Sequence, residues 1–114
     1  MKLSDVKEAL EADIIVGDEK LEIEVSGGAA SDLMSDLLKN PKEGALLLTG
    51  LTSIQAVRTS LIAGMAAIVF VRGKRPEAEI VLYAKQNDVP LLSTPFNMYA
   101  SCGRLYKKGL KSIR

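Results

Sequence analysis

Short continuous runs of hydrophobic residues alternate along the chain with segments in which hydrophobic residues recur at helical spacing. In the second half this order is regular and predicts three strands without polar positions, at Ala45–Leu48, Ala66–Val71 and Val89–Leu92. Strands without polar alternation are buried on both faces, and strands separated by helices pair in parallel through crossover connections. The pattern therefore predicts a parallel sheet covered by helices on both sides.

Three helices are predicted around these strands, each from its start signal and its hydrophobic spacing. They span Ser53–Ala63, Pro76–Gln86 and Pro95–Lys108. In the first helix Ile54, Val57 and Leu61 share one face, which we expect to be buried. In the last helix Thr94 is the expected N-cap and Gly109 the expected C-terminal cap.

The first half of the chain has a weaker pattern. Ser4 can cap a short helix to Glu11, and two extended runs follow, Ile14–Val16 and Leu21–Val25. Hydrophobic and charged residues alternate strictly in the second run, which is the spacing of a half-exposed strand. These two strands are expected to be an antiparallel or edge pair.

Two glycines, Gly27 and Gly28, are expected to end the second strand. A helix is then predicted from a cap at Ser31 or Asp32 to Lys39. Its buried stripe is predicted to consist of Leu33, Met34, Leu37 and Leu38.

Together these elements predict an α/β fold, a three-layer α/β/α domain whose mostly parallel central sheet has about five strands. The 114 residues suit one domain. We expect it to span residues 1–114, with a short basic tail at about residues 110–114.

The chain has one cysteine, Cys102, and no histidine. An internal disulfide, zinc sites with His or paired Cys ligands, and Ser-His or Cys-His nucleophile pairs are therefore excluded. Cys102 is in register with Met98 and Leu105 on the last helix, so we expect an inert buried thiol. No metal site and no cofactor are predicted.

The longest uncharged stretches, Gly44–Val57 and Thr59–Val71, have 14 and 13 residues. Both are shorter than the roughly 20 residues that a membrane helix needs. The first ten residues are already charged and periodic, unlike a signal peptide. We therefore expect a soluble, cytoplasmic protein that does not act at a membrane.

Charge is unevenly distributed along the chain. Residues 1–50 contain five Lys/Arg and eleven Asp/Glu, a net charge of −6, whereas residues 51–114 contain ten and three, a net charge of +7. The asymmetry indicates either a basic surface for an anionic partner, or two halves that complement each other within one fold or across a dimer. The last helix is cationic through Arg104, Lys107 and Lys108. A nucleic-acid partner is not expected, because no base-stacking aromatic residues support one.

A ligand is expected at the edge of the sheet where parallel strands end, because open α/β sheets bind ligands there. Loops rich in Gly, Ser, Thr and cations would share this edge: Ser26–Gly28, Thr49–Ser53, Arg72–Arg75 and Ser93–Thr94. Free N–H groups and dipoles at the adjoining helix starts favour an anion. The candidate ligand-binding residues are Thr49, Gly50, Thr52, Ser53, Arg72, Gly73, Lys74, Ser93 and Thr94.

Each of these residues also has a structural explanation, because hydroxyl side chains suit helix caps and glycines suit turns. A P-loop is absent: Gly73-Lys74 has Ile68 five residues before the glycine and no Ser or Thr after the lysine. The dinucleotide pattern G-x-G-x-x-G is also absent. Asp32 and Asp36 are carboxylates at helical spacing, and we expect them on a solvated helix face.

Three motifs occur in an order and spacing that resemble the DRTGG domain, and with it the N-terminal domain of bacterial HPr kinase/phosphorylase. They are the "LTG…IQ" loop and helix, "AIVFVRGKRPEAEI" and "VPLLSTPFNMY", within the run from Ala45 to Leu105. The segment "SGGAASDLMSDLL" is similar to small stand-alone members. The resemblance implies a three-layer α/β accessory or regulatory module that self-associates.

The resemblance does not imply kinase activity, because catalysis in the kinase/phosphorylase belongs to a separate P-loop domain. In other proteins the family's domain is attached to pyrophosphatases with nucleotide-sensing CBS domains, or to phosphotransacetylases. The family's Asp-Arg pair is replaced here by Leu51-Thr52, and its Thr-Gly-Gly by Val71-Arg72-Gly73. Leu51 and Thr52 are uncharged, so they cannot make a ligand contact that depends on the charges of the family's Asp-Arg pair.

Three hypotheses follow. The first is a non-enzymatic regulatory or interaction module that forms a homodimer. An unidentified protein is a further candidate partner of this module. The alternative is a small-molecule sensor that binds a nucleotide or other anion at the sheet edge. An enzyme that uses Ser, Lys or Asp without histidine is the third.

Overall fold

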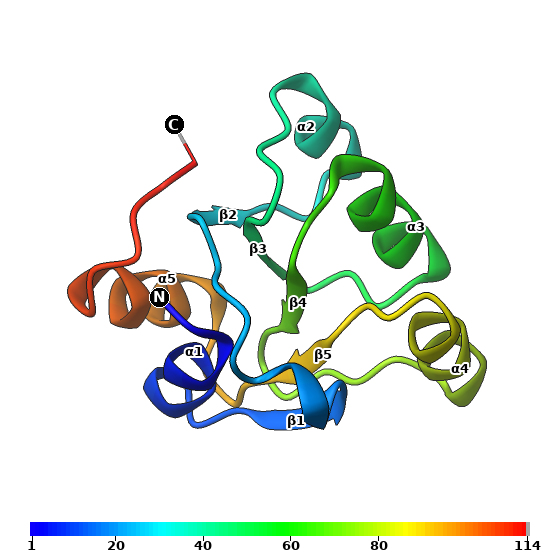
Figure 1. The fold of residues 1–114 in the computed structure, drawn as a ribbon, viewed down its shortest axis with the longest axis horizontal. Coiled ribbons are helices and arrows are strands. Elements are labelled where there is room, and N and C mark those ends of the chain that lie inside the picture. Colours follow the sequence, from blue (N-terminus) through cyan, green and yellow to red (C-terminus); the bar gives the residue numbers. More distant parts are fainter. Residues whose placement is uncertain (114) are drawn as a thin grey trace.

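A five-stranded sheet runs through the centre of the computed structural model, which describes residues 1–113 (Figure 1). Its strands are β1 (Asp13–Val16), β2 (Gly28–Ala30), β3 (Leu46–Thr49), β4 (Ala67–Phe70) and β5 (Leu91–Ser93). They lie in the order β1-β5-β4-β3-β2, in which β2 to β5 are parallel and β1 is antiparallel to β5. The predicted mostly parallel sheet is confirmed, with β1 as its antiparallel edge strand.

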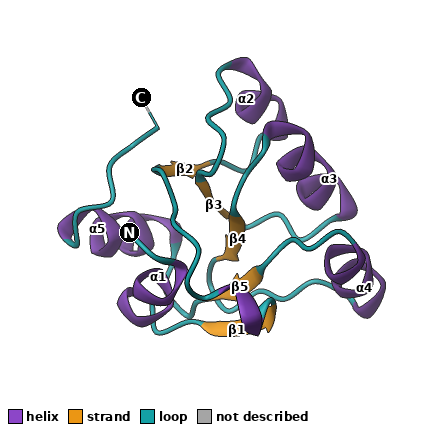
Figure 2. Ribbon diagram, viewed as in Figure 1, coloured by secondary structure: helices purple, strands orange, loops and turns teal. Residues whose placement is uncertain are grey.

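Helices cover both faces of the sheet, so the predicted three layers are confirmed (Figure 2). The helical elements are α1 (Leu3–Ala9), the 3₁₀ turn η1 (Asp18–Lys20), α2 (Met34–Lys39), α3 (Ile54–Ala63), α4 (Ala78–Gln86) and α5 (Met98–Lys107). The helices α2, α3 and α4 pack on one face, and α1 and α5 pack on the other.

The parallel strands follow one another across the sheet in chain order. Each crossover therefore steps in the same direction, and right-handed connections place α2, α3 and α4 on the same face. Within the described sheet the order of the parallel strands never reverses, so it lacks the switch-point crevice that holds ligands in doubly wound folds. Any site at the carboxyl edge must be built by the loops themselves.

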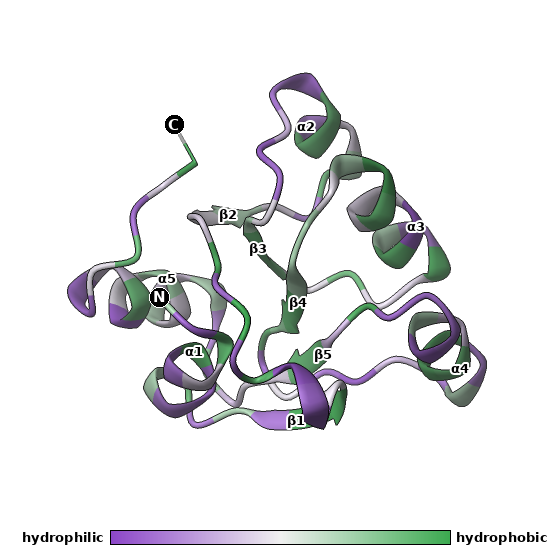
Figure 3. Cartoon of the chain, in the orientation of Figure 1, coloured by the Kyte–Doolittle hydropathy of each residue, from purple (hydrophilic) through white to green (hydrophobic). Residues whose placement is uncertain are grey.

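Both faces of the central strands are buried by apolar side chains, and strands β3, β4 and β5 are accordingly green in Figure 3. In β3, Leu46 and Leu48 pack with α1 and α5, whereas Leu47 packs with α2, α3 and α4. In β4, Val69 packs with α1 and α5, whereas Phe70 packs with α2, α3 and α4. Burial on both sides is why these strands show no polar alternation in the sequence.

The segment Leu21–Val25 is not a strand of the sheet, so that prediction is wrong. Its backbone pairs with the start of the chain: the Leu3 N–H donates to the Ile23 carbonyl at 2.9 Å, and the Val25 N–H donates to the Met1 carbonyl at 2.8 Å. Val25 is buried and Ile23 packs against the α1–α5 core. The alternation therefore reflects one buried side, which a segment outside the sheet can also have.

The second strand is formed instead by Gly28–Ala30, where the sequence predicted a break. Glycine and alanine are poor strand formers, yet Gly28 to Ala30 pair in parallel with Leu46 to Leu48. A Cβ atom on Gly28 would lie 3.3 Å from Leu110 Cδ2, so the close approach of the C-terminal segment favours glycine here.

The C-terminal segment packs onto β2. The Gly28 N–H donates to the Lys111 carbonyl at 2.8 Å, and the Ile113 N–H donates to the Gly28 carbonyl at 3.1 Å. Leu110 is 7% exposed and belongs to the α1–α5 core. Residues 110–113 of the predicted basic tail are therefore attached to the sheet, and Arg114 lies outside the described residues.

Three helices begin later than the sequence predicts. The first is α2, whose N-cap is Leu33 and not Ser31 or Asp32. The helix α4 begins at Ala78, after an extended N-cap at Glu77. The helix α5 begins at Met98, and its N-cap is Asn97, whose side chain accepts a hydrogen bond from the Ala100 N–H at 2.8 Å. For both α4 and α5 the proline, Pro76 or Pro95, lies in the loop before the helix and not in its first turn.

The predicted buried stripes are only partly correct. Met34 and Leu37 of α2 are buried, but Leu33 and Leu38 are 61% and 46% exposed. Leu61 is 37% exposed because small residues face the sheet from α3: Ala56, Val57, Ser60 and Ala63. A helix can pack closely on a sheet through small side chains, which leaves the larger ones outside.

We expect the same substitution at two leucines to separate these environments. Leu47→Ala removes a side chain that is 0% exposed, and it should lower the free energy of unfolding by about 2–5 kcal/mol. Leu61→Ala, at 37% exposure, should change it by about 1 kcal/mol or less. Urea denaturation of both variants measures the difference, and equal losses would contradict the orientation of α3.

Candidate functional site

The carboxyl ends of β2, β3, β4 and β5 open onto one edge of the sheet, because these strands are parallel. The loops at this edge cover residues 31–33, 50–53, 71–77 and 94–97. The loop Ser26–Gly28 was expected here but leads into β2 from the opposite edge, so this expectation is wrong. Its place is taken by the loop after β2, which contains Asp32.

The turn after β3 is held by the carboxylate of Asp32. Asp32 Oδ1 accepts hydrogen bonds from the Gly50 N–H at 2.7 Å and from the Thr49 hydroxyl at 3.0 Å. Thr49 Oγ1 in turn accepts from the Leu51 N–H at 3.1 Å. A Cβ atom on Gly50 would lie 3.2 Å from a guanidinium nitrogen of Arg72. A glycine at this position therefore lets the Asp32 carboxylate and the Arg72 guanidinium both approach the turn.

These contacts lower the pKa of Asp32 below its ordinary value. The hydrogen bond from the Gly50 N–H is the largest cause, and the Thr49 hydroxyl and the charges of Arg72 and Lys74 act in the same direction. Partial desolvation opposes them. Asp32 therefore serves as an anionic anchor for the turn. The expectation of a helix face is wrong for Asp32, since α2 begins only at Met34, whereas Asp36 lies on α2 and is exposed as expected.

The loop after β4 contains the cationic candidates. Arg72 and Gly73 both have positive φ angles, 58° and 68°. Their N–H groups donate to the carbonyls of Phe96 and Thr94 at 2.8 and 2.7 Å, which ties this loop to the loop after β5. The Lys74 ammonium group reaches back and donates to the Gly50 carbonyl at 3.1 Å.

Ser93 and Thr94 use their hydroxyl groups inside the protein. The Ser93 hydroxyl donates to the Lys74 carbonyl at 2.9 Å, and the Thr94 hydroxyl donates to the Leu10 carbonyl at 2.6 Å. The two residues are 4% and 0% exposed. Thr94 thus fastens the end of α1 and is not the cap of α5, for which the sequence predicted it.

An open cleft of about 690 Å³ lies between the β3–α3 loop and α4. Four of the predicted site residues line it: Gly50, Thr52, Ser53 and Lys74. The other lining residues are Leu51, Ile54, Glu77, Glu79, Ile80 and Tyr83. The structure thus brings these four predicted residues together, and leaves Thr49, Arg72, Gly73, Ser93 and Thr94 outside the lining.

Ser53 is the N-cap residue of α3, and its side chain makes no cap hydrogen bond. Its Oγ atom is buried and has no hydrogen-bond partner among residues 1–113. On the opposite wall, the Tyr83 ring has the Arg58 guanidinium 6.0 Å from its centre. The cleft therefore combines an uncommitted hydroxyl, a helix N-terminus and an aromatic ring.

Charges in the cleft are mixed. Lys74 is accompanied by Glu77 and Glu79 in the lining, so the cleft suits a ligand with an apolar or aromatic part better than a compact polyanion. Among residues 1–113 no group of three acidic, Cys or His side chains is arranged to hold a metal ion. In the same part of the chain, no helix has both the length and the apolar character needed to cross a membrane.

Sequence reasoning missed Asp32, Glu77, Glu79 and Tyr83 as residues of this edge. Asp32 could have been found if Gly28–Ala30 had been assigned as a strand, because the residue would then directly follow a parallel strand end. The α4 residues carry no sequence signal of a site. They reach the cleft only because α4 packs beside α3.

Replacing Asp32 by Asn is expected to make stability less dependent on pH. A lowered folded-state pKa stabilises the fold above the unfolded pKa, and this contribution is lost as the pH falls through the folded value. Asp32→Asn should therefore lower the melting temperature at about pH 7, with a free-energy loss of about 1 kcal/mol, and the gap to wild type should narrow as the pH falls below the ordinary aspartate pKa of about 4.

The matched control is Asp36→Asn on α2, where the exposed carboxylate pairs with Lys39 at 3.7 Å. We expect a change of about 0.5 kcal/mol or less for this variant. Thermal unfolding of the three proteins across the pH range provides the measurement. A gap for Asp32→Asn that stays equally wide in acid would contradict the anchoring role.

A search among solved structures found a similar architecture. The chain superposes with a TM-score of 0.76, at 18% identity, on the crystal structure of the CBS and DRTGG domains of the regulatory region of Clostridium perfringens pyrophosphatase, which is complexed with the activator diadenosine tetraphosphate. The match covers 96% of this chain and 47% of the other, so the chain spans about half the length of that protein region. At this identity the likeness concerns the fold.

A search of curated proteins gave no match. The family model of the DRTGG domain, in contrast, matches residues 5–107. The match includes all five strands, and helices α2 to α5 in full. It also includes the turn that Asp32 holds and the loop that contains Lys74. On this evidence the chain belongs to the DRTGG domain family.

Proposed function

We propose that this chain is a non-catalytic regulatory module, a single DRTGG domain of the cytoplasm that associates with a second copy of itself. The observation that carries the proposal is a set of large apolar side chains exposed on the layer of α2, α3 and α4. They are Leu33, Leu38, Leu61, Ile62 and Leu82. The three helices pack side by side in this order, so the exposed side chains belong to one helical layer.

Large exposed apolar patches are characteristic of surfaces that bind a partner. Ile62 on α3 is 76% exposed and Leu82 on α4 is 54% exposed, and covering them would remove this apolar area from water. Two copies can bring the same face together around a twofold axis, which is the commonest arrangement of homo-oligomers. The regulatory setting of the DRTGG domain in the pyrophosphatase structure supports a role in regulation.

Sedimentation velocity over a wide concentration range tests the self-association. We expect a mass above that of the 12.3 kDa chain, rising with concentration toward a dimer. Ile62→Lys should shift the protein to the monomer, because it places a charge in the contact. Tyr99→Lys adds the same charge at an exposed position of α5, on the opposite face of the sheet, and serves as the control. A wild-type chain that stays monomeric throughout would contradict the proposal.

The second candidate function is a sensor that binds a nucleotide or other small anion in the cleft between the β3–α3 loop and α4. The free Ser53 hydroxyl, unpaired among residues 1–113, favours it, together with the Thr52 and Lys74 side chains in the lining. A phosphate would be placed at the N-terminus of α3, where backbone N–H groups and the helix dipole favour negative charge. A base could then pack against Tyr83 and Ile54.

The pyrophosphatase region is complexed with diadenosine tetraphosphate, which suggests nucleotides as the first ligands to test. The two glutamates of the cleft favour ligands in which an aromatic or apolar part accompanies a limited negative charge. The other predicted residues, outside the lining, would support such a ligand through the loops they hold in place: Thr49, Arg72, Gly73, Ser93 and Thr94.

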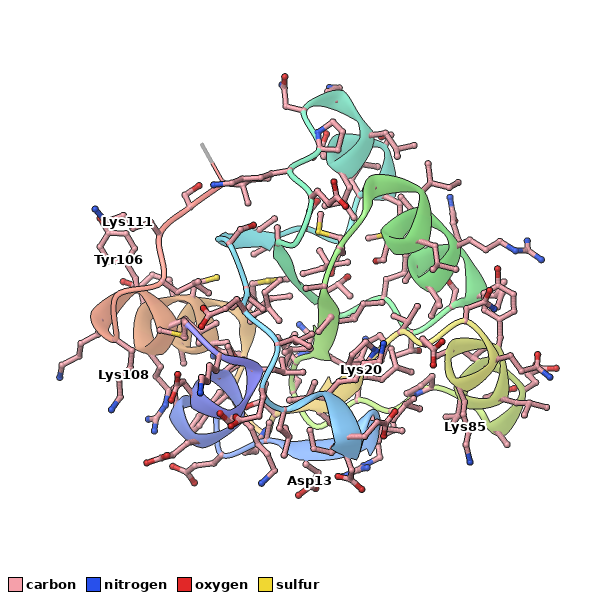
Figure 4. The ribbon with its side chains drawn as sticks, viewed as in Figure 1. Asp13, Lys20, Lys85, Tyr106, Lys108 and Lys111 are labelled. Atoms are coloured by element: carbon pink, nitrogen blue, oxygen red, sulfur yellow. The ribbon has the colours of Figure 1, made fainter. Side chains whose placement is uncertain are left out.

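Thermal unfolding against a panel of mononucleotides, dinucleotides and phosphorylated metabolites tests the sensor. A ligand at a hundredfold excess over its Kd should stabilise the protein by about 2.7 kcal/mol. Lys74→Gln should abolish most of the shift. Lys85→Gln is the control, since Lys85 lies on α4 but lines a different hollow (Figure 4). Equal shifts in both variants would place the ligand elsewhere, and a panel without any shift would remove the candidate.

A further inference from the structure

An apolar cavity of about 260 Å³ lies between β2, α5 and the C-terminal segment. It is on the α1–α5 face of the sheet, whereas the cleft described above lies beside α3 and α4. Its floor includes Leu48 of β3 and Leu105 of α5, and its wall includes Ala30 and Cys102. Tyr106 and Lys111 line it as well and lie on the same side of the molecule in Figure 4.

The cavity exists because this corner of the fold has little to fill it. Three helices cover one face of the sheet, but only α1 and α5 cover the other. On that face β2 presents Gly28 and Ala30, which pair with Leu46 and Leu48 of β3. The space that results is open to solvent on one side, where its lining includes the exposed residues Ala30, Tyr106 and Lys111.

The C-terminal segment closes one side of the cavity. It is held to β2 by the two backbone hydrogen bonds between Gly28 and residues 111 and 113. The segment begins at Gly109, which has a φ of 105°, and a Cβ atom at this position would meet nothing within 4 Å. The wall that carries Lys111 is held in place by these hydrogen bonds and by the buried side chain of Leu110.

The lining is also electrostatically one-sided. Lys111 is the one charged residue among the residues of the described chain that line the cavity, and no carboxylate lies among them. An apolar space with a single cation at its rim complements a molecule that has an apolar body and one negative charge. The cleft beside α4 differs in this respect, because Glu77 and Glu79 line it.

We propose that this cavity is a binding site for a small organic anion, an aromatic or short aliphatic carboxylate. Its apolar part would pack against Leu48 and Leu105, and its carboxylate would pair with the Lys111 ammonium group. The volume is sufficient, since apolar cavities of about 150 Å³ already bind benzene. The site shares no lining residue with the cleft and lies on the opposite face from the exposed α2–α4 layer, so it stands apart from both proposed functions.

Cys102 provides a built-in reporter, because it is the only cysteine of the chain and lines the cavity. It is half-buried, and desolvation raises the pKa of its thiol. The rate of its reaction with a thiol reagent is measured at constant pH with benzoate, hexanoate or indole as the probe. At about ten times the Kd, the rate should fall by about tenfold, because only the empty protein reacts.

Three variants of the full chain locate the binding. Ala30→Leu should fill the cavity and abolish protection of Cys102, whereas Ala30→Ser keeps the volume and should retain it. Lys111→Gln should weaken benzoate and hexanoate by about three- to fivefold, the effect of losing an exposed ion pair. Binding of indole, which has no charge, should be unchanged in Lys111→Gln.

The outcomes decide the proposal. Absence of protection by all three probes would overturn it, as would equal protection in Ala30→Leu and wild type. Equal loss of indole and benzoate binding in Lys111→Gln would overturn the role of the charge. If Ala30→Leu fails to fold, methyl NMR of the wild-type chain gives the same test, because a bound probe must shift the methyl signals of Ala30 and Leu48.

Discussion

Burial of β3 and β4 on both faces is the constraint from which most of this structure follows. Their residues Leu46–Leu48 and Ala67–Phe70 are at most 5% exposed, so helices must cover both sides of the sheet. The chain order of the parallel strands commits the three crossover helices to one face. The other face is left to α1 and α5, from the two ends of the chain. This unequal cover explains why segments 21–25 and 110–113 pack on that side, and why it retains a cavity beside β2.

The regular part of the fold was predictable because its signal is burial itself. Apolar runs and helical spacing identified the three strands from β3 to β5 and the helices after them. The errors arose where one pattern has two physical causes. Alternation in Leu21–Val25 comes from packing beside α1 and not from a sheet. The strand Gly28–Ala30 has no propensity signal, since its place is fixed by pairing with β3 and by the close C-terminal segment. Tertiary context overrides weak local preference in both cases.

The sequence predicted that the candidate site lies at the carboxyl edge of the parallel strands. It did not predict which side chains form hydrogen bonds with one another there. Hydroxyl residues in its loops looked equivalent in the sequence, yet the structure divides them. The Thr49, Ser93 and Thr94 hydroxyls bond within the protein, whereas Ser53 has no partner among residues 1–113. Which hydroxyl is satisfied depends on groups distant in sequence, such as Leu10 and Lys74. A capping pattern alone cannot contain that information.

Asp32 gives the clearest case of chemistry that the linear sequence conceals. The sequence interpretation placed Leu51-Thr52 where an adjacent Asp-Arg pair is expected, and in the structure an aspartate and an arginine from other loops lie at this turn. Asp32 comes from the loop after β2 and binds Gly50, and Arg72 comes from the loop after β4 and lies close to the same glycine. Only two residues before Asp32, Ala30 lines the apolar cavity on the other side of the sheet. One short segment therefore shapes both candidate sites, and the edge strand with the weakest sequence signal is the element that connects them.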